Sequence, residues 1–443
     1  MQQLPLGTNE PESDWSIPEQ AAWPPQATRA HGLQQLDAFI CKAGRAYQTH
    51  RNTDLGSGRH GHVSLLSPYL RHRLIDESEV ISQVLNQHTQ SEAFKFIQEV
   101  FWRTYWKGWL EQRRLLWPEY QQQLPAVLQQ QLQNRRQSAV YTAAISAATQ
   151  VPLFNEWCEE LINTGYLHNH ARMWFASIWI FTLKLPWQLG ADFFVRHLID
   201  GDPASNTLGW RWVAGLHTAG KSYLATPKNI RTCAQERLAG RSDQELGLNK
   251  LASSTFNLPE YLSAKALQKT DIRWPAPESA ETAGYRGNHG RTALLLTEED
   301  LTWMPSQMPQ GLVALNASPR SVLASSSDIV THFVEAAIDD GLKRLTSHYA
   351  AEGLPCAGMA LDDDALVQWL VDERMDEAVC AYAPMGPTRL RLRALRQTLA
   401  CKGISLRMQM RDYDRLVWPH ANRGFFQLGK RIPEFLDIMR GEQ

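Results

Sequence analysis

The spacing of apolar residues changes once along this chain, and that change constrains the fold more than any other feature of the sequence. From Gly32 to about Ala225, apolar residues recur with the period of an α-helix, as in SEAFKFIQEVFWRTYWKGWLEQRR (residues 91–114). No segment of this half shows the alternation that is typical of a half-buried strand. We therefore predict an all-helical domain over residues 31–235, preceded by a polar, proline-rich extension of residues 1–30.

The pattern is different after residue 290, where short apolar runs alternate with helical stretches. Strand, helix and strand in this order predict a parallel sheet with helices packed against it. We predict a Rossmann-like α/β domain over residues 291–443, joined to the helical domain by a polar connector of residues 236–290. The runs predicted to be strands are TALLLT (292–297), GLVALN (311–316), CAGMAL (356–361), AVCAYA (378–383) and ISLRMQM (404–410).

Composition excludes several classes of protein. The formal net charge is -1, so any contact with nucleic acid needs a local basic patch. The six cysteines contain no C-x-x-C pair, which predicts reduced thiols and no structural metal site. The start of the chain lacks the pattern of a signal peptide, and the longest apolar stretch, Met173 to Leu183, is too short to span a bilayer. We therefore expect a cytoplasmic protein without a membrane segment.

The segment LIDGDPASNTLGWRW (198–212) contains two aspartates and two tryptophans. Asp202 directly precedes Pro203, and an aspartate N-cap followed by proline predicts a helix that begins at Pro203. Asp200 then lies in the turn before that helix. A calcium loop is excluded because Ala204 and Arg211 stand where oxygen ligands are required. Simple capping, a pair of acid/base carboxylates, and a carboxylate that faces a ligand at the helix start remain as interpretations.

The preceding segment, TGYLHNHARMWFASIWI (164–180), is also expected to be a helix. Asn169 and Arg172 share one face of it, and Met173 follows at i+4 from Asn169. His168 and His170 point to different sides of a helix, so a metal-binding pair is not expected there. Arg172 either forms an ordinary ion pair or faces a planar cofactor or a phosphate group.

These two segments, together with two others, resemble the flavin-binding core of the photolyase/cryptochrome family. HVSLLSPYL (62–70) is similar to the family's TS-x-LSPYL phosphate-binding turn, and FWRTYW (101–106) is similar to its WRE-F-Y helix. The order and spacing of all four segments agree over roughly residues 40–230. The resemblance implies a helical FAD-binding domain, but it does not extend to an antenna chromophore, which stays unknown.

The resemblance also implies roles for individual residues. Trp210 and Trp187 correspond to the first two tryptophans of the chain that carries electrons to photoexcited flavin, and Asn206 corresponds to the residue beside flavin N5. Met173 and Trp212 are expected to face a lesion in the substrate. Contacts with FAD are implied for Tyr47, Ser64, Leu65, Leu66, Ser67, Trp102, Asn169, Arg172, Asp200, Asp202, Asn206 and Trp210.

The chain departs from the family pattern at several positions. Val63 replaces the threonine of the phosphate-binding turn, and the third tryptophan of the electron chain, expected near Ala144, is missing. Tyr141 or a different surface tryptophan is a candidate replacement. Thr104 stands where the glutamate of ordinary photolyases touches the damaged base pair, and threonine cannot provide the same charge-assisted hydrogen bonds. The chain order is also permuted, because residues 377–419 resemble part of an α/β domain that comes first in the family.

One local feature favours nucleic acid as a partner. Residues 203–235 contain no acidic side chain but include Arg211 and Lys221, with Trp212 between them. Cations beside aromatic rings suit a single-stranded or flipped-out base, although a solvated surface loop has the same composition. Trp212, Arg211 and Lys221 are therefore expected substrate contacts, and the resemblance adds Thr104 and Met173.

Three hypotheses follow from the sequence. The first is a blue-light-active FAD protein that repairs pyrimidine lesions in UV-damaged DNA by electron transfer from reduced FAD, which would make it a photolyase-like lyase. The second is a cryptochrome-like photoreceptor without repair activity, which Thr104 and the incomplete tryptophan chain favour. The third is a scaffold that binds no flavin. The oligomeric state stays open.

Overall fold

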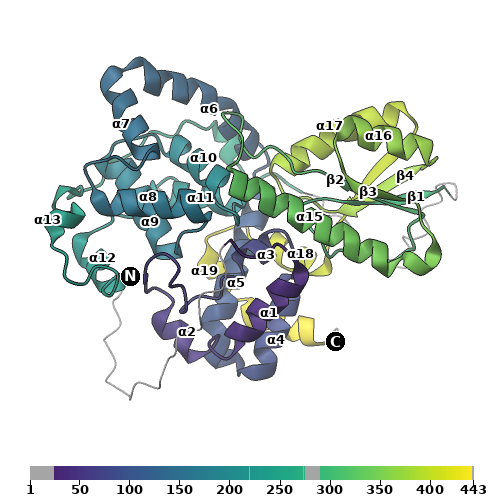
Figure 1. Ribbon diagram of the computed structural model, residues 1–443, viewed down its shortest axis with the longest axis horizontal. Coiled ribbons are helices and arrows are strands. Elements are labelled where there is room, and N and C mark those ends of the chain that lie inside the picture. The colour runs from purple at the N-terminus through teal and green to yellow at the C-terminus, as the bar shows by residue number, and fades with distance from the viewer. Residues whose placement is uncertain (1–23, 219, 273, 275–289, 442–443) are drawn as a thin grey trace.

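The structure consists of a large helical part and a parallel sheet with helices on both faces, placed side by side (Figure 1). It is a computed structural model, and it describes residues 24–218, 220–272, 274 and 290–441. The predicted extension up to residue 23, and residues 275–289 of the predicted connector, lie outside the described residues. The predicted fold class, a helical part followed in the chain by a parallel α/β layer, is confirmed.

Several helices of the helical part begin at a residue whose side chain caps the first turn. The Thr89 hydroxyl accepts a hydrogen bond from the Glu92 amide at 3.4 Å, and the Glu92 carboxylate accepts one from the Thr89 amide at 3.3 Å, which starts α5. Among the described residues, no helix has the length and apolar content needed to cross a membrane. The helices are Arg29–Ile40 (α1), Arg45–His50 (α2), Ser67–Arg71 (α3), Glu77–Gln87 (α4), Gln90–Glu111 (α5), Leu116–Gln133 (α6), Arg135–Ile145 (α7), Pro152–Thr164 (α8), Asn169–Ser177 (α9) with a π-helical turn Ile178–Thr182 (η1), Trp187–His197 (α10), Pro203–Val213 (α11), Pro227–Cys233 (α12), Asp243–Leu246 (α13) with a 3-10 turn Leu248–Lys250 (η2), and Ala264–Leu267 (α14).

The sheet has the strand order β3-β2-β1-β4-β5, and every pairing is parallel. Ala293 of β1 pairs with Gly311 of β2 on one side and with Ala378 of β4 on the other. The five strands occur where the apolar runs predict them. Their bounds are Thr292–Leu296 (β1), Gly311–Leu315 (β2), Cys356–Leu361 (β3), Glu377–Ala381 (β4) and Ser405–Gln409 (β5).

Helices cover both faces of the sheet, which explains why the central strands read as continuous apolar runs. Leu294 and Leu312 face the same core as α15, which is continuous with the core of the helical part. Ala293 and Val313 face a separate core on the opposite side, shared with α16 and α17. The bounds of these helices are Asp328–His348 (α15), followed by a 3-10 turn Ala350–Glu352 (η4), Asp363–Asp372 (α16) and Pro387–Cys401 (α17).

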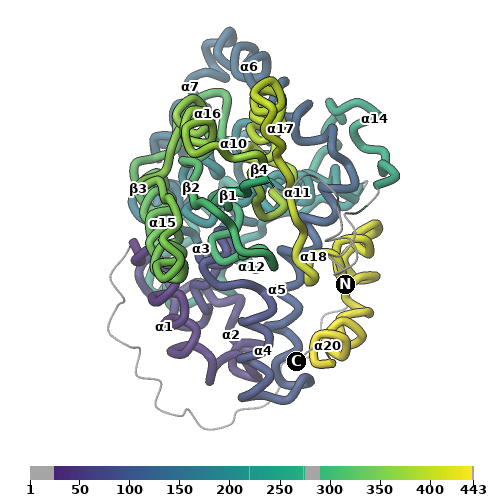
Figure 2. Tube along the Cα trace, turned by 90° about the vertical axis from the view of Figure 1, so that its right-hand side faces the viewer, coloured from purple at the N-terminus to yellow at the C-terminus, as the bar shows by residue number. Residues whose placement is uncertain are grey.

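The C-terminal helices leave the sheet and pack on α5 (Figure 2). They are Asp412–Val417 (α18), a 3-10 turn Trp418–His420 (η5), Phe425–Gly429 (α19) and Ile432–Gly441 (α20). Gly108 of α5 permits the close approach, because a Cβ there would lie 2.9 Å from the Trp418 Cα. Phe435 stacks on Phe101 of α5 with a centroid distance of 6.0 Å. Tyr413, Phe425 and Phe435, which fall within the predicted α/β domain of residues 291–443, therefore share a core with the helices of the first half.

The first half of the predicted connector is also packed on the helical part. Arg237 donates to Asp54 at 3.1 Å and to Glu160 at 2.8 Å, and all three side chains are buried. Leu246 and Leu262 are buried in the same core. Arg237, Leu246 and Leu262, which lie in the first part of the predicted connector, are therefore packed on the helical part.

A cluster of buried charges joins the two parts. Arg73, in the turn after α3, donates to Glu77 at 3.0 Å, to Asp414 of α18 at 2.6 Å and to Asp300 at 3.3 Å. Asp300 follows β1 and also accepts from Arg411 at 2.6 Å. Burial by itself would raise the pKa of Asp300, but the Arg411 and Arg73 guanidinium groups lower it to about 2. Asp300 therefore stays charged at neutral pH.

We predict that Arg73→Met lowers the free energy of unfolding by about 3 to 5 kcal/mol, because it leaves three buried carboxylates without their shared cation. Urea denaturation measures the change. Lys343→Met is the control, because Lys343 forms an exposed pair with Asp339 and its removal should change stability little. Equal effects of the two substitutions would contradict the importance of the cluster.

Candidate functional site

The residues expected to bind a cofactor converge on the turn between α10 and α11. Asp200 is buried in this turn, and its Oδ2 accepts from Nη2 of Arg172 on α9 at 2.9 Å. Burial by itself would raise the pKa of Asp200, but the Arg172 guanidinium and the Ser67 hydroxyl hold it below its ordinary value. The structure thus brings Ser67, Arg172 and Asp200 together from three separate elements, and Asp200 remains an anion.

Asp202 begins α11, as the Asp-Pro step predicts. Its carboxylate accepts from the Ser205 amide at 2.7 Å, with Pro203 in the first turn. Lys107 of α5 lies 3.7 Å from the same carboxylate. Although burial would raise the pKa of Asp202, Lys107 and the more distant Arg71 lower it to about 2. Capping is therefore observed, and the helix start lies directly beside the Asp200 turn.

The segment from Ser64 to Ser67 forms a strained turn in front of α3. Leu65 has a φ of 54°, a conformation that L-residues other than asparagine and aspartate rarely adopt. The Ser64 carbonyl accepts from the Gln35 side chain at 3.2 Å, and the Leu66 amide donates to the Ser64 hydroxyl at 3.4 Å. Backbone strain of this kind often marks a binding site, and this turn is joined to the site through Ser67.

Other expected cofactor residues are placed differently. Tyr47 on α2 packs its ring against Phe39 and Phe96, at centroid distances of 6.0 and 5.1 Å. Asn169 is exposed at the start of α9. Trp102 on α5 is stacked on Phe425 of α19, with centroids 3.6 Å apart and ring planes 10° apart. The structure therefore covers one face of the Trp102 ring with the C-terminal segment.

Two expected substrate contacts, Thr104 and Arg211, are enclosed by the protein. Thr104 is 1% exposed and its hydroxyl lies 3.0 Å from the Tyr413 hydroxyl of α18. Arg211 is also 1% exposed, and its guanidinium is paired with Glu260 at 2.5 Å. Arg211 is therefore held away from solvent by its ion pair with Glu260, whose own side chain is 28% exposed.

The remaining expected contacts lie nearer the surface. Met173 is half-buried on α9, and Lys221 is exposed. Trp212 is half-buried and stacks on Tyr223 with a centroid distance of 5.6 Å. This surface therefore carries the Lys221 cation and the Trp212 ring, whereas the Arg211 cation is enclosed.

Asn206 and Trp210 extend from α11 toward α10. The Asn206 amide nitrogen donates to the Ala191 carbonyl at 2.7 Å, and no described residue donates to its Oδ1. Trp210 is buried, and its ring is 6.1 Å from that of Trp179 in a T-shaped contact. A Cβ on Gly190 would lie 2.3 Å from the Trp210 ring, so this glycine is needed for the indole to pack.

The aromatic path away from Trp210 differs from the predicted one. Trp179 contacts Tyr141 at 6.1 Å, while Trp187 instead stacks on Tyr120 at 5.5 Å. Among the described residues no ring contact joins Trp210 to Trp187. The sequence prediction did not include Trp179, which lies in the π-helical turn η1 that follows α9.

The residues around Asp200 fit a ligand that is partly anionic and rich in hydrogen-bonding groups. Nη1 of Arg103 on α5 and the Ser205 hydroxyl are buried and have no hydrogen-bond partner among the described residues. Unpartnered buried polar atoms are unfavourable unless a ligand or water satisfies them. FAD, with its phosphates and its polar ring edge, matches this donor set.

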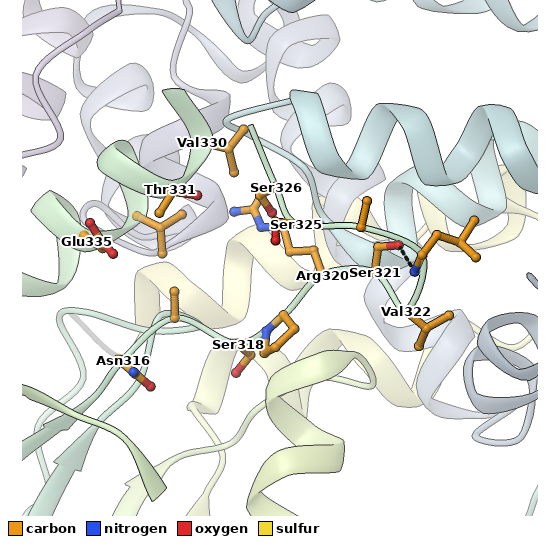
Figure 3. Close-up of a pocket in the computed structure, with 15 residues that line it drawn as sticks. Asn316, Ser318, Arg320, Ser321, Val322, Ser325, Ser326, Val330, Thr331 and Glu335 are labelled. Atoms are coloured by element: carbon orange, nitrogen blue, oxygen red, sulfur yellow. Dashed lines mark hydrogen bonds between the residues drawn. The ribbon is translucent and has the colours of Figure 1, made fainter. Parts of the chain in front are cut away.

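A cleft of about 440 Å³ lies elsewhere, between the β2–α15 loop and the first turns of α15 (Figure 3). Its wall includes Asn316, Ser318, Arg320, Thr331 and Glu335. None of the expected cofactor residues lines it.

Comparison with known proteins identifies the helical part. Residues 96–243 match the family model described as the FAD binding domain of DNA photolyase. The matched region includes Arg172, Asp200 and Asp202, and its cofactor is FAD. The match does not extend to Tyr47 or to the turn from Ser64 to Ser67.

The relatives found among curated proteins are named deoxyribodipyrimidine photo-lyase. The one from Alkalihalophilus pseudofirmus is 27% identical over 194 residues, which are 44% of this chain and 39% of that protein. The one from Agrobacterium fabrum is 30% identical over 205 residues, 46% of this chain and 41% of that protein. The chain therefore spans half or less of the length of these relatives.

Two solved structures show a partial similarity. A bacterial class III photolyase from Agrobacterium tumefaciens is 24% identical with a TM-score of 0.38, over 47% of this chain and 43% of that one. A cryptochrome from Synechocystis is 22% identical with a TM-score of 0.38, over 52% of this chain and 48% of that one.

We predict that Asp202→Asn lowers the free energy of unfolding by about 2 to 3 kcal/mol at pH 7. The folded-state pKa of Asp202, about 2, lies below the unfolded value of about 3.9, so its stabilisation is complete above the unfolded pKa and is lost as the pH falls toward 2. Asparagine is also a good N-cap, so the loss reports the charge. Urea denaturation between pH 7 and pH 3 should show the gap to wild type closing at low pH.

Asp364→Asn, which changes an exposed carboxylate on α16, is the control for this pH series. It should show no such gap. A constant gap for Asp202→Asn at every pH would mean that its charge contributes nothing.

Proposed function

We propose that this chain, which belongs to the photolyase/cryptochrome family, is a light-driven FAD protein that repairs pyrimidine lesions in UV-damaged DNA. The observation that carries the proposal is the ion pair of half-buried Arg172 with buried Asp200 beside the capped start of α11, inside the region that matches an FAD binding domain. The curated relatives are named photo-lyases, and repair by this chain is inferred from that likeness.

When bound, FAD supplies light absorption and electron transfer, and the protein supplies binding and orientation. In this proposal, Arg172 and Arg103 provide positive charge to the cofactor, and Asp200 accepts hydrogen bonds from it. The turn from Ser64 to Ser67 presents backbone amides and hydroxyl groups for phosphate. The unengaged Oδ1 of Asn206 is available as an acceptor beside them.

The rings of Trp210, Trp179 and Tyr141 form the proposed route for electrons to the site. Each ring contacts the next, and Tyr141 is 8% exposed, so the route approaches the surface. Electron transfer is favoured through rings in contact, and aromatic side chains are the protein groups that are readily oxidised. Tyr141 thus takes the place of the missing third tryptophan.

The proposed contacts with DNA are Met173, Trp212 and Lys221. Trp212 is held by its stacking on Tyr223, so its ring is preorganised for a base that leaves the duplex stack. The exposed Lys221 suits a phosphate of the backbone. Single-stranded DNA needs no unpairing and is therefore the preferred form in this proposal.

A second function, that of a photoreceptor without repair activity, is favoured by the enclosure of Thr104. Tyr413 and Phe425 cover Thr104 and Trp102 on α5, so the C-terminal segment occupies a face that a lesion would otherwise reach. A closed face would leave light absorption and electron transfer intact.

Blue-light irradiation of the purified protein with UV-damaged single- and double-stranded oligonucleotides separates these functions. Loss of pyrimidine dimers supports repair, with single strands repaired faster. Flavin reduction without any loss of dimers supports the photoreceptor. A protein that purifies without flavin absorption bands, and does not acquire them when FAD is added, contradicts both.

We predict that Trp179→Phe slows flavin photoreduction more than Trp187→Phe does. Phenylalanine keeps the packing but is much harder to oxidise than tryptophan. Of these two tryptophans, only Trp179 has a ring contact with Trp210 among the described residues. The rate of flavin reduction under continuous blue light measures the effect, after the FAD content of each variant has been matched. The opposite order would assign the route to Trp187.

A further inference from the structure

The turn that carries Asp200 is held by two arginines whose own supports lie in the α/β part. The Leu198 carbonyl accepts from Nη1 of Arg320 at 2.9 Å, and the Gly201 carbonyl accepts from Nε of Arg71 at 3.1 Å. Arg320 lies on the β2–α15 loop, and Arg71 ends α3. These two carbonyls precede and follow Asp200 in the chain, so the turn is fixed on both sides of its carboxylate.

Arg71 is aligned by a residue of the α/β part. Both oxygens of Glu299, which follows β1, accept from its guanidinium, at 2.7 and 3.0 Å. Two parallel hydrogen bonds fix the plane of a guanidinium as well as its position. Thr388 of α17 donates to the same carboxylate at 3.1 Å. Glu299 therefore sets where Nε of Arg71 meets the Gly201 carbonyl.

Arg320 is aligned in a similar way. Its Nη2 lies 3.4 Å from Nε2 of His72, whose Nδ1 donates to the Glu298 carbonyl at 2.7 Å. Burial, together with the neighbouring charge of Arg71, holds the pKa of His72 far below its ordinary value, so its Nε2 is an acceptor for Arg320.

The β2–α15 loop, which carries Arg320 (Figure 3), is itself hydrogen-bonded to α10. The Ser321 hydroxyl donates to Asp192 at 2.5 Å, and the Ser327 amide donates to the Arg196 carbonyl at 2.9 Å. The loop is therefore held to α10 at two points that follow Arg320 in the chain.

Gly201 leaves little room for this turn to shift. A Cβ at this position would lie 2.9 Å from Nη1 of Arg320 and 3.0 Å from the Val195 carbonyl. The turn is thus packed directly against the Arg320 guanidinium, and a change at Arg320 is transmitted to the backbone beside Asp200.

We propose that Arg320 and Glu299 are positioning residues for FAD, which fix the backbone on the two sides of Asp200 and so hold its carboxylate where the cofactor needs it. This inference rests on the proposed placement of FAD at Asp200. It gives the α/β part a role in cofactor affinity that acts through Leu198 and Gly201.

The test compares Arg320, which lies on the β2–α15 loop, with a second arginine that contacts this loop. Arg320→Met removes the donor to Leu198, and Arg320→Lys restores one donor. Arg391→Met is the matched control, because Arg391 also bonds the β2–α15 loop, at the Asn316 carbonyl (2.7 Å), and is a partly buried arginine without contact to the Asp200 turn. FAD dissociation constants from flavin fluorescence and the thermal midpoints of the apoproteins are measured for all variants.

We expect Arg320→Met to raise the FAD dissociation constant by about tenfold or more, as groups that orient a ligand-binding side chain commonly do. Arg320→Lys should recover part of the affinity. Arg391→Met should lower the thermal midpoint but leave FAD affinity unchanged.

Glu299→Gln keeps the shape of the side chain and carries the test if Arg320→Met fails to fold. It should weaken FAD binding and change the visible circular dichroism of the bound flavin, a signal that global stability alone does not move. If wild type binds FAD and the Arg320 and Glu299 variants bind it equally well, the positioning role is overturned while the FAD site stands. If wild type binds no FAD, the proposed function falls with it.

Discussion

Two buried arginines on either side of His72, Arg71 and Arg73, are the constraint on which the arrangement of the molecule depends. A buried cation without a partner is strongly unfavourable, so the turn after α3 can be buried only when carboxylates reach it from elsewhere. Glu299 and Asp300 arrive from the carboxyl end of β1, and Asp414 arrives from α18. Assembly of the α/β part and of the C-terminal helices on the helical part is therefore required by charge as well as by apolar packing.

Buried charged residues of this region also contact the candidate cofactor site. Arg71 reaches the Gly201 carbonyl, and Lys107 reaches Asp202, so the acidic turn is bonded to the groups that join the two parts. β1 is the central strand of the sheet, and Glu299 and Asp300 follow its carboxyl end. From there they reach Arg71 and Arg73. The α/β part is thus in contact with the helices that match the FAD binding domain model, and the C-terminal helices pack on α5.

Local patterns were enough to predict much of this structure. Five apolar runs became five parallel strands, and the Asp202–Pro203 step became a capped helix, because burial on both faces and capping are properties of short segments. Contacts between distant segments carried no such signal. Thr104 meets Tyr413 across 309 residues, and Arg211 meets Glu260 across 49, so neither enclosure could be read from the sequence. The choice of Trp179 over Trp187 depends on packing at Gly190 and on the π-helical turn after α9, which periodicity does not specify.

We propose that FAD lies against the turn that carries Asp200 while Arg320 and Arg71 hold this turn through the Leu198 and Gly201 carbonyls. The most direct measurement is an experimental structure of the chain with FAD added. We expect FAD to contact Arg172 and Asp200. The Leu198 and Gly201 carbonyls should still accept hydrogen bonds from Arg320 and Arg71. FAD bound instead in the cleft beside the β2–α15 loop, with the Arg172–Asp200 pair untouched, would contradict it.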